Sequence, residues 1–195
     1  MTSDVPARSK EDLSKEIKDR VVIIGTCIEH MKSIVKYASS SDAFNDAFAI
    51  IYASLQSYVY IELFKLFDKG KDSKEYNIYA LIGMIEDENN TYHKMLSECS
   101  ADIEVIRNRR NHVFAHEIGE DAENVFRNSK FKDSEVDPVE RLLGRITEIC
   151  RAANKELFPN TYISNAGRFD GWCYQATRLI KKREEEIADL VKANG

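Results

Sequence analysis

The residues best suited to chemistry lie together in segment 107–116, whose sequence is RNRRNHVFAH. This segment holds three arginines and two of the chain's four histidines, although the formal net charge of the whole chain is -5. Guanidinium groups hold phosphate oxygens, and an imidazole takes or gives a proton near neutral pH because its unperturbed pKa is about 6.5. The combination is suited to gripping and cleaving a phosphodiester.

Arg110 occupies an unusual position in this segment. At about 100° per residue, a helix here places Arg110 on one stripe with three apolar residues, Ile103, Ile106 and Phe114. A guanidinium buried without a partner costs several kcal/mol, so the position predicts an acidic partner, an open cleft or a phosphate. Glu62 is the expected acidic partner that would pair with or orient Arg110, because it falls in the apolar stripe of an earlier helix.

A family resemblance rests on the same residues. Arg110 and Asn111, followed by four residues and then His116, resemble the R-x(4-6)-H motif of the HEPN superfamily, in which a polar residue commonly follows the arginine. Four features resemble AbiU-like members of the abortive-infection (phage resistance) family: the preceding long helices, the ending of the second helix at 66–68, segment 77–85 and the ending at 114–116. The resemblance covers about residues 10–157. It implies an all-α, HEPN-like helical bundle of long antiparallel helices that forms a homodimer.

The resemblance also implies an activity, which is metal-independent cleavage of RNA where two copies of the motif meet across the homodimer. His116 would be the general acid or base, Arg110 would stabilise the charge on the phosphorane, and Asn111 would orient the phosphate or hold His116. Attack by a ribose 2′-OH would leave a 2′,3′-cyclic phosphate and a 5′-OH. The expected role is phage defence or that of a toxin, with an antitoxin or regulatory protein as a further partner.

Three other residues, Arg107, Arg109 and His112, are the expected additional contacts to RNA, although a structural role is the plainer interpretation of His112. On one ideal helix Arg110 and His116 sit about 120° apart. A break in the helix, or the second subunit, must therefore bring them together.

Two other functions remain open. A non-catalytic HEPN module would use the same cleft to bind nucleotide, RNA or a partner protein. A zinc hydrolase would use His112 and His116, but Val113 and Ala115 stand where H-E-x-x-H and H-x-x-E-H carry glutamate. The sequence also lacks a Gly-rich phosphate loop, which argues against an NTPase, and G-x-S-x-G, which argues against a serine hydrolase. The resemblance implies a site with neither a metal nor a cofactor.

The elements that must position these residues are long helices. Only 8 Gly and 3 Pro occur in 195 residues, and apolar residues recur without strand-like alternation, which predicts an all-α fold. After a loose lead-in over residues 1–9, we treat 10–195 as one domain. The helices are expected at about 10–38, 41–67, 78–86, 91–117, 137–158 and 172–192, with an irregular excursion at 120–136 and a connection through Gly167 and Gly171.

Apolar stripes define the expected core. The first helix should bury Ile17, Val21, Ile24, Ile28, Met31 and Val35, and the second Phe44, Phe48, Ile51, Leu55, Tyr58 and Glu62. The four widely spaced cysteines form no C-x-x-C pair and are expected to be reduced thiols of the core. His30 and His93 are assigned to helix surfaces. No run of 18 apolar residues occurs, which predicts a cytoplasmic protein without membrane contact.

Overall fold

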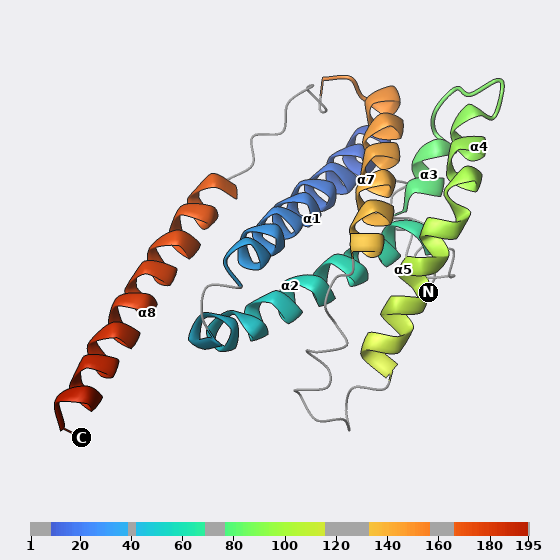
Figure 1. Cartoon of the computed structure of the whole chain (residues 1–195). Helices are drawn as coiled ribbons and strands as arrows, with labels where there is room; N and C mark the ends of the chain where they lie inside the picture. The colour runs from blue at the N-terminus through green and yellow to red at the C-terminus, as the bar shows by residue number, and fades with distance from the viewer. Residues whose placement is uncertain (1–8, 39–41, 69–76, 116–132, 157–165, 195) are drawn as a thin grey trace, which may run out of the picture.

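The computed structural model describes residues 9–38, 42–68, 77–115, 133–156 and 166–194, and the regular structure of these residues is entirely α-helical. Figure 1 shows a bundle of long helices in which α1 and α2 lie at the centre, α5 and α7 lie on one side and α8 on the other. The predicted all-α fold is confirmed. None of the described helices combines the length and apolarity needed to cross a bilayer.

Helix α1 (Lys10–Ala38) has the bounds expected from the sequence. Its first turn is capped by Ser9, whose Oγ accepts a hydrogen bond from the Asp12 backbone N–H at 3.1 Å and donates one to the Asp12 carboxylate at 2.6 Å. The cap satisfies a backbone N–H that has no partner within the helix. α1 packs against α2 (Asp42–Phe67), and together they carry much of the buried core.

The apolar face of α2 differs from the predicted stripe. Side chains of α2 are described from residue 48 on, so the predicted Phe44 lies outside the described side chains. Those that are buried are Phe48, Tyr52, Gln56, Val59, Tyr60, Leu63, Leu66 and Phe67. Of the predicted residues, Ile51 and Leu55 are only partly buried, and Tyr58 is exposed. Apolar residues occur nearly all round this helix, so its periodicity alone does not select the core face. The packing against α1 and α5 selects it instead.

Near its C-terminal end, α1 buries a different side chain from the one predicted. Val35 is exposed, whereas Ile34 is buried. The cause is α8 (Ala166–Asn194), which covers another side of α1 through contacts of Phe169 with His30 and of Asp170 with Lys36. His30 is therefore half-buried, with its ring centroid 4.1 Å from that of Phe169, and burial lowers its pKa. The prediction of a surface histidine was wrong here.

Short helices join α2 to the functional segment. Asn77 caps α3 (Ile78–Ile82): its side chain accepts from the Ala80 N–H at 2.9 Å and donates to the Asp68 carbonyl at 2.6 Å. One buried amide thus ties the end of α2 to the start of α3. The predicted helix at 78–86 is shorter than expected, because Gly83 ends it.

The predicted helix at 91–117 is two helices in the described residues, α4 (Thr91–Glu98) and α5 (Ser100–Ala115). Asp87 caps α4 by accepting from the Thr91 and Tyr92 N–H groups at 2.8 and 2.9 Å. The break falls at Cys99, whose φ of -89° and ψ of 10° are not helical. After this break α5 packs on α2 and α7.

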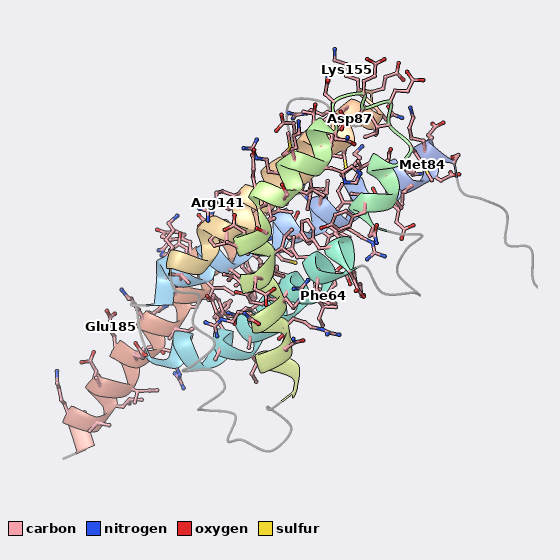
Figure 2. All side chains as sticks on the ribbon, turned by 90° about the vertical axis from the view of Figure 1, so that its right-hand side faces the viewer. Phe64, Met84, Asp87, Arg141, Lys155 and Glu185 are labelled. Atoms are coloured by element: carbon pink, nitrogen blue, oxygen red, sulfur yellow. The ribbon has the colours of Figure 1, made fainter. Side chains whose placement is uncertain are left out.

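Helix α7 (Asp133–Ala153) begins earlier than predicted. Pro138 lies inside it rather than at its first turn, and residues 133–136 are helical rather than part of an excursion. Proline inside a helix removes one backbone hydrogen bond, because it has no backbone N–H. Arg141 fixes α7 to α5 through two bonds to the Asp102 carboxylate, at 3.0 and 2.7 Å, and Figure 2 shows Arg141 on this face.

Helix α8 begins at Ala166, so Gly167 and Gly171 lie inside it rather than in the predicted connection. A glycine inside a helix costs up to about 1 kcal/mol relative to alanine. The contacts of Phe169 and the fully buried Cys173 with the bundle offset this cost. All four cysteines are buried free thiols, as the sequence predicts.

Candidate functional site

Arg110 and Asn111 lie on an exposed part of α5, directly after the turn that carries Ile106. Ile106 is 1% exposed and anchors this turn in the core. The Arg110 guanidinium carbon lies 4.4 Å from the centre of the Phe64 ring of α2, and Nη1 donates to the Asn111 Oδ1 at 3.2 Å. Figure 2 shows Phe64 on the face where α5 lies beside α2.

This geometry explains how Arg110 occupies an apolar stripe. Its guanidinium is stacked on an aromatic face, which attracts a cation by about 0.5–1 kcal/mol at an exposed site. Stacking leaves the edges of the planar group directed away from the ring, so N–H donors stay available for a phosphate. The arrangement orients Arg110 without neutralising its charge.

Glu62 does not have the partner expected from the sequence. Its carboxylate accepts from Arg20 of α1 at 2.9 Å and from Lys65 at 2.6 Å. Arg20 also pairs with Glu16 at 3.0 Å. Among the described contacts, Glu62 therefore joins α2 to α1, and an orienting role toward Arg110 has no support from them.

The other predicted site residues divide into two groups. Arg107 lies one turn before Arg110, is exposed and forms an ion pair with Glu104, while Arg109 is half-buried on another side of α5. The backbone of His112 is part of α5, but its side chain lies outside the described part of the chain. All of His116 lies outside it as well. The approach of His116 to Arg110 therefore stays a prediction.

A pocket of about 510 Å³ opens beside Arg107. Its walls come from the end of α2, α3, α4 and α5, and its lining residues are Phe67, Tyr79, His93, Leu96, Ser97, Ser100, Ile103, Glu104 and Arg107. Phe67 and Leu96 are buried, and burial raises the pKa of Tyr79, an effect that Arg107 opposes. The pocket combines aromatic and aliphatic surface with polar groups.

Sequence reasoning did not find this pocket, because its residues come from four helices. His93 is exposed on α4, as predicted, and its side chain also lines the pocket. The only sequence signal was the cluster of aromatic and polar residues on both sides of Asn77, which does not by itself indicate that they meet.

A bundle of long helices with Arg110 and Asn111 exposed near the end of a helix, just before His116, has the features of a HEPN protein. The family model described as AbiU2, a HEPN family, matches residues 7–166. The chain therefore belongs to the HEPN AbiU2 family, and its core is a HEPN module of the abortive-infection type. The match includes α1 to α7 and ends at the first residue of α8. No curated protein and no solved structure gives a significant match.

Proposed function

We propose that this protein is a metal-independent endoribonuclease of the HEPN type that acts in phage defence or as a toxin. The observation that carries the proposal is the exposed Arg110 guanidinium, held over Phe64 and beside Asn111. This group is fixed in direction, keeps its charge, and lies in the motif that ends at His116. Such a planar donor set matches the geometry of a phosphate, and the phosphates of RNA are the ligands that we propose for it.

The proposed reaction is transesterification followed by release of two fragments. His116, as general base, removes the proton of a ribose 2′-OH, and the 2′-oxygen attacks the adjacent phosphorus. Arg110 stabilises the negative charge that builds on the phosphorane oxygens, while Asn111 holds the phosphate in place. The bond from phosphorus to the 5′-oxygen breaks, and that oxygen takes a proton from a protonated His116, which replaces the proton that the base removed from the 2′-OH. The products carry a 2′,3′-cyclic phosphate and a 5′-OH.

A second copy of the chain completes the proposed site. Arg110 and His116 would lie about 120° apart on one continuous helix, so a homodimer that joins two segments supplies the missing geometry. The exposed Arg107 and Arg110 side chains also form the surface that an antitoxin or another regulatory protein would cover to keep the nuclease silent.

The pocket extends this site along the RNA. On α5, Arg107 precedes Arg110 by three residues, and on α2 Phe67 follows Phe64 by three residues, which is about 4.5 Å of helix. The pocket and the contact of Arg110 with Phe64 are therefore neighbours along the same two helices. Unpaired RNA bases stack on aromatic side chains. We propose that a base next to the cleaved phosphate enters the pocket, with its own phosphate on Arg107.

Arg107→Ala tests this extension. We expect KM for RNA to rise about tenfold, or ~1.4 kcal/mol, with kcat nearly unchanged, because Arg107 would bind substrate and transition state equally. Arg145→Ala is the matched control. Arg145 is also exposed and also pairs with a glutamate three residues away, Glu148, but it does not line the pocket. Equal KM values for the two variants would show that RNA does not bind in the pocket.

The activity itself is tested with labelled transfer and messenger RNA in the presence of EDTA, with chemical identification of the new ends. The proposal predicts cleavage that leaves cyclic phosphate ends. Cleavage that EDTA abolishes would point to the zinc hydrolase alternative. Binding of RNA or nucleotide without any cleavage would replace the nuclease with a binding module.

A further inference from the structure

The pocket beside Arg107 is lined by polar residues of two neighbouring helices. On α5 the lining residues include Ser100, Glu104 and Arg107, which recur at spacings of four and three and therefore lie on one face of the helix. On α4 the lining residues His93 and Ser97 lie four positions apart and share a face in the same way. The pocket thus offers hydrogen-bonding groups from both helices in addition to its apolar surface.

Glu104 is the one carboxylate among the described residues that line the pocket. Its side chain is 51% exposed, and its Oε2 accepts a hydrogen bond from Nη1 of Arg107. An ionised carboxylate has about four acceptor sites and no donor. The ion pair with Arg107 uses one of these sites, so the others can accept hydrogen bonds from a ligand in the pocket.

The ion pair also places this acceptor next to a group that binds phosphate. A guanidinium has five N–H donors, and the bond to Glu104 uses one on Nη1 of Arg107. The other donors can hold a phosphate while the ion pair stays intact. The two side chains together match a ligand that carries both a phosphate and adjacent N–H donors.

A carboxylate distinguishes the four bases of RNA by their Watson–Crick edges. Guanine presents two adjacent donors there, N1–H and the N2 amino group, which fit the two oxygens of one carboxylate. Adenine and cytosine present one amino group beside a ring nitrogen with a lone pair, and uracil presents one N–H between two carbonyl oxygens. Against a carboxylate, each of these three bases would therefore face at least one acceptor with another acceptor.

We propose that the pocket is selective for guanine, and that Glu104 is the residue that determines this specificity. Its carboxylate accepts from N1–H and from the N2 amino group of the base. The half-buried Tyr79 supplies an aromatic ring for stacking, and the exposed His93 imidazole supplies a donor for the O6 or N7 acceptor.

The inference rests on the proposed path of RNA, in which the phosphate of this nucleotide lies on Arg107 and the cleaved phosphate on Arg110. The cleaved phosphate is then the one on the 3′ side of the bound guanosine. Its own 2′-OH is the attacking group, so the new RNA end should be a guanosine 2′,3′-cyclic phosphate.

Binding of 5′-mononucleotides to the full chain, followed by NMR titration, tests the selectivity without any need for cleavage. The guanosine nucleotide should bind about 10- to 100-fold more tightly than those of adenosine, cytidine and uridine, the usual effect of one bidentate contact to a base. Inosine monophosphate lacks only the N2 amino group and should have an intermediate affinity. Equal affinities, or no binding of the guanosine nucleotide, would overturn the inference.

Glu104→Gln tests the assigned residue. Its amide carries one acceptor atom and one donor atom, so the guanosine nucleotide should bind no more tightly than that of adenosine. Glu148→Gln is the matched control, because Glu148 is also exposed and pairs with an arginine three residues away, Arg145, but does not line the pocket. The control should keep the full preference for guanine. If both variants keep it, or both lose it, Glu104 is not the specificity residue.

Mapping of the new RNA ends separates this inference from the nuclease proposal. Cleavage after guanosine, with the preference lost in Glu104→Gln, would support both. Selective binding of the guanosine nucleotide by a protein that does not cleave RNA would support the guanine pocket and reject the nuclease. Cleavage after all four bases alike would reject the guanine pocket and leave the nuclease in place.

Discussion

Arg110→Ala is expected to lower kcat/KM for RNA cleavage by about 100- to 1,000-fold, the usual effect of removing a donor that stabilises transition-state charge. The guanidinium is exposed and its main described contacts are the Phe64 ring and Asn111. Its loss should therefore reduce the free energy of unfolding by only about 0.5–1 kcal/mol. The measurements are steady-state cleavage kinetics and a thermal melt of the same sample.

Arg110→Lys separates charge from geometry. Lysine keeps the positive charge but has no planar set of donors, so it should restore only part of the lost rate. Wild-type cleavage by Arg110→Ala would exclude the catalytic role. A large drop in melting temperature, together with lost activity, would instead mean that the stacking of Arg110 on Phe64 is structural.

Ile106→Ala is expected to have the largest effect on stability. Ile106 is 1% exposed on the α5 turn before Arg110, and truncation of a buried isoleucine leaves a cavity that costs about 2–5 kcal/mol. At about 2–4 °C per kcal/mol for a chain of this size, the melting temperature should fall by roughly 4–20 °C. Thermal unfolding followed by circular dichroism measures this change.

Ile50→Ala is the matched control, because it is the same substitution in a helix interior at a side chain that is 77% exposed. It should change the free energy of unfolding by about 0.5 kcal/mol or less. If the two variants melt at the same temperature, α5 is not anchored through Ile106, and the placement of Arg110 on Phe64 loses its basis.

The sequence predicted the helices best where local interactions define their ends. α1 has the expected bounds because Ser9 and Asp12 cap its start, and α2 ends at Phe67 as expected. The start of α7 was missed because Pro138 is tolerated near its beginning, and that of α8 because tertiary contacts of Phe169 outweigh the glycines. Long-range packing, which local propensity does not encode, decided the start of α8.

The candidate site was predictable in its residues but not in its contacts. The periodicity correctly placed Arg110 next to apolar groups. The expected alternatives were an acidic partner, an open cleft or a phosphate, and none of them anticipated the Phe64 ring on which the guanidinium lies. Glu62 instead forms an ion pair with Arg20, which lies 42 positions earlier in the chain. The two residues meet only because α1 packs on α2. The pocket beside Arg107 is assembled from four helices, so only the folded chain reveals it.

The most direct test of the nuclease is a comparison of wild type and His116→Ala on the same RNA pool in EDTA, with the new ends identified. A general acid or base contributes about 100- to 10,000-fold, so the variant should lose cleavage by that factor while its helical content and melting temperature stay close to wild type. The wild type should leave 2′,3′-cyclic phosphates. Equal cleavage by both proteins, or no cleavage by a well-folded wild type, would contradict the account.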